Sequence, residues 1–181
     1  MPGNWGYLGQ DVKQYLCENF SKDSTILDIG CGHGFYFKLL NDYFLNFDAV
    51  EVWKPYIEEF ELEKMYKNVF NTNILDFEFE YYDIIILGDI LEHLSRDDAK
   101  NLLNRLKDKC EEMIVVVPYN LPQDEVFGNK YEIHIQPDLN DKIMKEHFSM
   151  LELIKLGDKE LKLKIECGEN VYYYCAFKKA K

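Results

Sequence analysis

Short apolar runs alternate with longer amphipathic stretches along this chain, and this alternation is the feature that most constrains its fold. The apolar runs are of strand length, roughly four to seven residues, and the stretches between them, roughly ten to fifteen residues, suit helices. Strands that alternate with helices in this way form βα units, whose strands lie parallel to one another. We therefore predict an α/β protein with a doubly wound, mainly parallel sheet.

The same pattern sets the boundaries of the expected elements. Strands are predicted at 25–29, 47–52, 68–72, 82–87 and 113–117, and helices at 8–20, 35–44, 55–64 and from Ser95, whose hydroxyl would cap the last of them. After Pro118 we expect a long loop over 119–136 with an extended piece at 130–135, then a helix at 139–147 and strands at 151–156, 161–166 and 171–178.

Composition narrows the classes of partner. Acidic residues outnumber basic ones by 33 to 21, for a formal net charge of −12, whereas a nucleic-acid-binding protein needs a basic surface to displace counterions from phosphate. The five cysteines include no C-x-x-C pair, so we expect free thiols in a reducing compartment. Because the chain shows neither a signal-like start nor a long apolar stretch, we expect a cytoplasmic protein without membrane or nucleic-acid partners.

One motif points to a ligand. The strand predicted at 25–29 runs into a turn with three alternate glycines, Gly30, Gly32 and Gly34, and a helix follows. Glycine permits a positive φ and lets the backbone approach a ligand closely. Asp28 stands two residues before the first glycine, where a carboxylate suits a cationic amino group better than a pyrophosphate. The dinucleotide fingerprint G-x-G-x-x-G is not matched, because the third glycine comes one residue early.

This segment resembles motif I of the class I S-adenosylmethionine-dependent methyltransferases, acid-x-G-x-G-x-G. The resemblance extends over roughly residues 24–119 and includes an L-E-H-L segment, Leu91 to Leu94. It implies a Rossmann-like, doubly wound, mainly parallel seven-stranded sheet with an antiparallel C-terminal strand, and S-adenosylmethionine as the cofactor. It also implies that Glu51 holds the ribose hydroxyls. The cofactor-binding residues carried over are Asp28, Gly30, Gly32, Gly34, Glu51, Val52, Asn73, Ile74, Asp76 and Gly88.

Two positions stay open within that set. Many relatives carry an aspartate where this chain has Asn73, so either Asn73 or Asp76 would meet the adenine amine. We expect a single domain over 1–181, with an N-terminal helix or lid over 1–23, a cofactor-binding core over 24–119, and an acceptor-side loop with the C-terminal strands over 120–181. Trp5 and Tyr7 would either cover the cofactor as a lid or pack against the sheet edge.

Candidate catalytic residues follow the fourth and fifth strands. They are Asp89, His93 and His134. In an extended segment Glu132 would project to the same side as His134 and could orient its ring, so that His134 would act as the general base. The alternatives are that His134 is a loop histidine bonded to the backbone and that His93 caps or packs against the next helix. The spacing of the four histidines is not that of a metal site, so we expect no metal.

The expected activity is methyl transfer from S-adenosylmethionine to a small molecule or an accessible group, for example a sugar or metabolite hydroxyl. An alternative is a methyltransferase-like module that binds the cofactor without turnover and assists a partner protein. A third reading is aminopropyl transfer on the same fold. The oligomeric state does not follow from the sequence.

Overall fold

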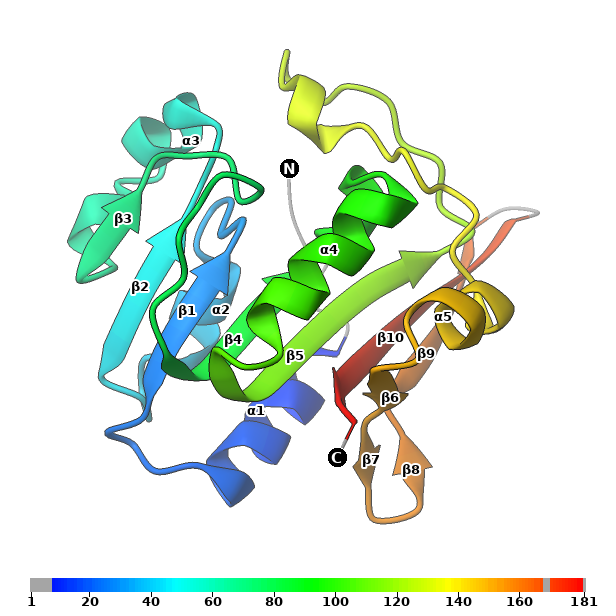
Figure 1. Cartoon of the computed structure of the whole chain (residues 1–181), viewed down its shortest axis with the longest axis horizontal. Coiled ribbons are helices and arrows are strands. Elements are labelled where there is room, and N and C mark those ends of the chain that lie inside the picture. Colours follow the sequence, from blue (N-terminus) through cyan, green and yellow to red (C-terminus); the bar gives the residue numbers. More distant parts are fainter. Residues whose placement is uncertain (1–7, 168–169, 181) are drawn as a thin grey trace.

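The computed structural model describes residues 8–167 and 170–180, so Trp5 and Tyr7 lie outside the described residues. One large sheet crosses the molecule in the order β3-β2-β1-β4-β5-β10-β6, and β9 pairs with β10 beside this path (Figure 1). The strands are β1 (Thr25–Ile29), β2 (Asn46–Val50), β3 (Asn68–Phe70), β4 (Tyr82–Gly88), β5 (Cys110–Tyr119), β6 (Leu151–Leu153), β9 (Lys162–Cys167) and β10 (Asn170–Lys179).

The directions of these strands confirm the predicted fold class. β1 pairs in parallel with both β2 and β4, and the parallel pairing continues to β3 on one side and β5 on the other. β10 runs antiparallel to β5, as expected for a C-terminal strand. In the part of the chain that the structure describes, β9 adds an eighth strand to the seven expected, because it folds back on β10 as a hairpin.

Helices cover both faces of the sheet (Figure 1). They are α1 (Gly9–Asn19), α2 (Phe35–Leu40), α3 (Lys54–Glu59), α4 (Arg96–Leu106) and α5 (Asp141–His147), with the 3-10 turns η1 (Leu62–Lys64), η2 (Leu91–His93) and η3 (Lys130–Glu132). A small separate hairpin joins β7 (Lys155–Leu156) to β8 (Lys159–Glu160). In the residues that the structure describes, no helix combines the length and apolarity needed to cross a membrane.

The core consists of two layers, one on each face of the sheet. Alternate residues of β4 divide between them: Ile85 and Leu87 pack under α4 and α5, whereas Ile84 and Ile86 pack under α1, α2 and α3. A strand buried on both faces needs apolar residues at every position, which explains the uninterrupted apolar run at this point of the sequence. The helices therefore enclose the sheet from both sides, as in a doubly wound fold.

Several predicted elements differ from the structure, among them the helix expected over 35–44, which ends at Leu40, and the strand expected over 151–156, which splits into β6 and β7. The helix expected over 55–64 breaks after Glu59 because Glu61 adopts a left-handed conformation, with φ at 52°, and a separate turn follows. The extended piece expected over 130–135 is wrong, since Lys130–Glu132 form a 3-10 turn. The side chain of Asn129 starts that turn by accepting a hydrogen bond from the Tyr131 N–H, a local competition with extended structure that is typical of asparagine.

The N-terminal cap of α4 forms as predicted, and it offers a test of the fold. The Ser95 hydroxyl accepts a hydrogen bond of 3.1 Å from the Asp98 N–H. We expect Ser95→Ala to lower the free energy of unfolding by about 1 kcal/mol, since it leaves one helical donor without its partner. Urea unfolding measures this loss. Ser149→Ala, at an exposed position, is the control and should be neutral; equal stability of the two variants would contradict the assigned cap.

Candidate active site

A pocket opens at the carboxyl edge of the sheet, at the ends of β1 and β4, where the strand order reverses: the chain continues from β1 to β2 on one side and from β4 to β5 on the other. Ligand sites of open α/β sheets lie at this position. The turn after β1 forms one end of the pocket, and η2 with the loop over 121–136 forms the other. The predicted site residues that line it are Gly30, Gly32, Glu51, Val52, Asn73, Ile74, Gly88, Asp89, His93 and His134.

The glycine turn is shaped to receive a ligand at Gly32. This residue has φ at +52°, a conformation that side chains rarely adopt, and a Cβ placed on it would meet no atom within 4 Å. The open side of Gly32 belongs to the pocket lining. Its N–H donates a 3.0 Å hydrogen bond to Oε2 of Glu51, so the turn is tied to the carboxylate that follows the neighbouring strand.

Glu51 connects two turns at the bottom of the pocket. Its Oε2 accepts the hydrogen bond from the Gly32 N–H, and its Oε1 accepts one of 2.7 Å from the Trp53 N–H. The side chain is 5% exposed, and burial raises the pKa of its carboxyl above the usual value although both backbone bonds oppose this. Each carboxylate oxygen keeps a lone pair after these bonds, so the pair of oxygens can still accept hydrogen bonds from a ligand with neighbouring hydroxyls.

Asp28 lies below the glycine turn rather than in the pocket lining. Its carboxylate accepts a 2.6 Å hydrogen bond from the Tyr66 hydroxyl and is only 1% exposed. Burial raises the pKa of Asp28 to about 7, with a smaller contribution from Glu51 that acts in the same direction. Gly34 also lies outside the lining, against Met65. Both residues therefore support the turn from beneath in this structure.

The raised pKa of Asp28 predicts how stability depends on pH. The folded protein holds a proton on this carboxyl up to about pH 7, whereas the unfolded chain releases it near pH 4. Asp28 therefore stabilises the fold fully below pH 4, and this contribution, on the order of 4 kcal/mol, is lost as the pH rises through 7. Urea unfolding between pH 4 and 7 should show that the free energy of unfolding falls less for Asp28→Asn than for the unchanged chain. The same pH dependence in both proteins would contradict the assignment.

The segment after β3 places the two residues proposed for the adenine amine differently. Asn73 and Ile74 line the pocket, while Asp76 is exposed outside the lining. The Asn73 side-chain oxygen accepts a 3.0 Å hydrogen bond from the Leu75 N–H. Its amide NH₂ can donate to a ligand, and its oxygen keeps a second lone pair that can accept.

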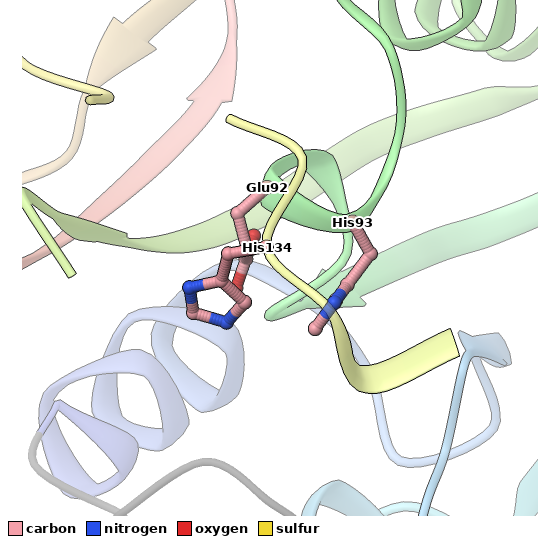
Figure 2. Close-up of side chains that lie close together, drawn as sticks. All are labelled: Glu92, His93 and His134. Carbon is pink, nitrogen blue, oxygen red and sulfur yellow. The ribbon is translucent and has the colours of Figure 1, made fainter. Parts of the chain in front are cut away.

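The far end of the pocket brings together residues from two distant segments. Glu92 and His93 lie on η2, and His134 comes from the loop that passes over this turn (Figure 2). The rings of His93 and His134 are 4.8 Å apart between centroids and nearly perpendicular. Asp89, with φ at 56°, precedes η2 and also lines the pocket. The three predicted catalytic residues are therefore neighbours at one end of the site.

Gln136 holds this loop in place. Its side-chain amide donates to the Leu91 and Leu94 carbonyls, at 2.8 and 3.0 Å, and its backbone N–H donates to the Glu92 carbonyl. Arg96 of α4 in turn donates to the Gln136 side-chain oxygen. These contacts fix the distance between His134 and η2. Sequence reasoning missed Gln136, since an isolated glutamine in a loop carries no pattern.

Glu132 does not play the part expected for it. Its Oε1 accepts a 3.0 Å hydrogen bond from the Tyr56 hydroxyl. The His134 ring is instead oriented by the Leu121 carbonyl, 2.6 Å from its Nδ1. The expectation that a neighbouring carboxylate orients this histidine is wrong, because η3 replaces the extended segment that would have aligned the two side chains.

Burial controls the charges at this end of the pocket. It raises the pKa of Asp89 to about 7 and that of Glu92 well above the usual value, and neighbouring carboxylates add to both effects. It lowers the pKa of His93 to about 4 and that of His134 below the usual value. Both imidazoles are therefore neutral at pH 7 and each has one ring nitrogen that accepts.

The fold and this site define a class: a doubly wound α/β protein with a cofactor pocket at the switch point of the sheet, bounded by a glycine turn and by a carboxylate after the second strand. The model of a methyltransferase domain family matches residues 6–136. The chain belongs to this family, whose members are S-adenosylmethionine-dependent class I methyltransferases.

Individual proteins show the same relationship. An uncharacterised protein of Methanocaldococcus jannaschii is 30% identical over 118 residues, which cover 64% of this chain and 51% of that protein. The chain thus spans about half the length of the curated relative it matches.

Solved structures resemble this chain over nearly its whole length. An S-adenosylmethionine-dependent methyltransferase from Clostridium acetobutylicum matches with a TM-score of 0.69 at 12% identity, over 99% of this chain and 94% of that one. The N-methyltransferase NodS from Bradyrhizobium japonicum matches with a TM-score of 0.65 at 12% identity, over 96% and 94%. At such low identity these likenesses show a shared fold.

Proposed function

We propose that this chain binds S-adenosylmethionine in the pocket at the carboxyl edge of the sheet and transfers its methyl group to a hydroxyl of a small molecule. The observation that carries the proposal is that one continuous pocket has the Gly32–Glu51 pair at one end and the acid and imidazole side chains of η2 and its covering loop at the other. The first end suits a nucleoside with an amino-acid tail, and the second suits an acceptor that must lose a proton.

The residues fit the cofactor part by part. The open side of Gly32 leaves room for the amino-acid tail against the backbone. Glu51, one strand away, offers acceptor oxygens to the ribose hydroxyls. The amide NH₂ of Asn73 can donate to a ring nitrogen of adenine, and the side chains of Val52 and Ile74 can cover the faces of the ring. Asp28 supports the turn from below, so its effect on binding would be indirect.

The residues at the acceptor end would carry out the steps that the cofactor does not provide. S-adenosylmethionine, when bound, supplies an activated methyl group on its sulfonium, so the chain has to position the acceptor and remove a proton from it. Gly88 lies directly over the Tyr36 ring, which a Cβ at this position would approach to 2.2 Å. Both residues line the pocket between its two ends.

A small acceptor fits the rest of the molecule best. The formal net charge of −12 opposes nucleic acid as a substrate, and a cytoplasmic location without membrane partners stays a prediction from the sequence. In this proposal residues 1–181 act as one domain, with the cofactor bound mainly by 24–119 and the acceptor held mainly by 120–181.

Cofactor turnover tests the proposal. The purified chain, incubated with methyl-labelled S-adenosylmethionine and sugars or other metabolites that carry hydroxyls, should form S-adenosylhomocysteine and labelled ether in equal amounts. Turnover that requires the acceptor supports methyl transfer. Binding of S-adenosylhomocysteine without turnover on any acceptor would favour a cofactor-binding module that assists a partner.

A further inference from the structure

Three side chains with metal-binding atoms meet at the acceptor end of the pocket. The ligand atoms of Glu92, His93 and His134 all lie within 4.8 Å of one another. They come from two segments, η2 and the loop over 121–136, and Figure 2 shows them grouped where these segments cross. All three residues line the pocket.

Both histidines are held in the tautomer that a metal requires. Nδ1 of His93 is 3.1 Å from the Ile133 carbonyl, and Nδ1 of His134 is 2.6 Å from the Leu121 carbonyl. A carbonyl oxygen only accepts, so each Nδ1 carries the hydrogen, and each Nε2 keeps a free lone pair. Metal-binding histidines are oriented in the same way, with the second ring nitrogen donating to a carbonyl or carboxylate.

Glu92 lacks the partners that a buried carboxylate needs. It is 1% exposed, and in the part of the chain that the structure describes neither of its oxygens has a hydrogen-bond partner. A carboxyl group removed from water without a hydrogen-bond partner costs roughly 1–3 kcal/mol even when it is neutral, and more when it is ionised. Asp89, three residues before Glu92, adds a third buried acidic oxygen without a partner. A cation bound between Glu92 and the two imidazoles would remove this cost.

We propose that Glu92, His93 and His134 form a binding site for one divalent transition-metal ion. Two imidazoles and one carboxylate are ligands that zinc, iron and cobalt accept, whereas magnesium prefers oxygen ligands alone. Metal–ligand bonds of about 2.0–2.2 Å place ligand atoms roughly 3–4 Å apart, so the three side chains would draw together on binding. Three protein ligands leave coordination positions open toward the pocket.

The consequence for catalysis rests on the proposed function. An acceptor hydroxyl bound to the ion loses its proton to water more readily, because a bound metal lowers the pKa of such a group. The resulting oxygen forms a bond to the methyl carbon with its lone pair, while the C–S bond breaks and its electron pair stays on sulfur. The products are a methyl ether and S-adenosylhomocysteine, and His134 serves as a ligand instead of a general base.

This site departs from the expectation of no metal, which rested on spacing along the chain. His134 follows His93 by about 40 residues, so no short motif joins them. The fold brings the two together because Gln136 anchors the loop to η2.

Cobalt titration of the full chain tests the site without any turnover. We expect one equivalent of Co²⁺ to bind, with visible absorption of nitrogen and oxygen ligands and no near-ultraviolet band from a thiolate. Glu92→Gln and His134→Ala should each lower the Co²⁺ affinity at least tenfold. His147→Ala, on α5 and outside the pocket lining, is the matched control and should bind as the unchanged chain does.

A parallel titration with S-adenosylhomocysteine separates this proposal from the proposed function. A chain that binds S-adenosylhomocysteine but not Co²⁺ overturns the metal site and leaves the cofactor pocket standing; the reverse result overturns the cofactor pocket alone. Circular dichroism and retained S-adenosylhomocysteine binding show that each variant is folded. Cobalt binding that is equal in all variants, or that produces a thiolate band, assigns the ion to another place and overturns the proposal.

Discussion

Glu51→Ala is expected to weaken the binding of S-adenosylhomocysteine by about 1.5–3 kcal/mol, which corresponds to a loss of affinity of roughly ten- to 150-fold. The substitution removes the acceptors proposed for the ribose hydroxyls. It also takes the partner from the Gly32 and Trp53 N–H groups, so the two turns that frame the pocket lose their common support. Isothermal titration calorimetry measures the change directly.

The control for this experiment is Glu78→Ala, which removes an exposed carboxylate from the segment between β3 and β4. It changes the net charge by the same amount and should leave the affinity unaltered. If both variants bind S-adenosylhomocysteine as tightly as the unchanged chain, the cofactor does not contact Glu51.

Gly32→Ala is expected to reduce the same affinity at least tenfold, because its methyl group would enter the space proposed for the amino-acid tail. The substitution also costs about 1 kcal/mol of folding stability, since φ is +52° at this position. Stability and binding must therefore be measured on the same samples.

Gly157→Ala provides the matched control. Gly157 has φ at +59°, and a Cβ there also meets nothing within 4 Å, but the residue lies between β7 and β8, outside the pocket lining. We expect both alanine variants to unfold at similar urea concentrations and only Gly32→Ala to lose affinity. A parallel loss of affinity in both would show that backbone strain, and not occupied space, causes the effect.

Much of the fold could be predicted because the deciding patterns are local. β1 has the predicted boundaries, and β4 extends only one residue beyond them, since each strand is an apolar run between clear breaks. Ser95 marks the start of α4 because hydroxyl caps act within one helical turn. The break at Glu61 was missed, as a left-handed glutamate has no counterpart in the amphipathic pattern.

The two ends of the pocket differed in how far sequence could predict them. The cofactor end depends on residues at the ends of adjacent strands, so a contiguous motif and its strand order place Gly32, Glu51 and Asn73 together. The position of Asp28 beneath the turn depends on Tyr66, which is distant in sequence. At the acceptor end, contacts between a loop and η2 decide the geometry, and no short pattern encodes them.

Binding of S-adenosylhomocysteine to the unchanged chain tests the central claim most directly. Isothermal titration calorimetry should show saturable binding at one site per chain, with the affinity lowered by Gly32→Ala and kept by Gly157→Ala. A folded sample, verified by circular dichroism, that releases no heat with either S-adenosylhomocysteine or S-adenosylmethionine would contradict the account.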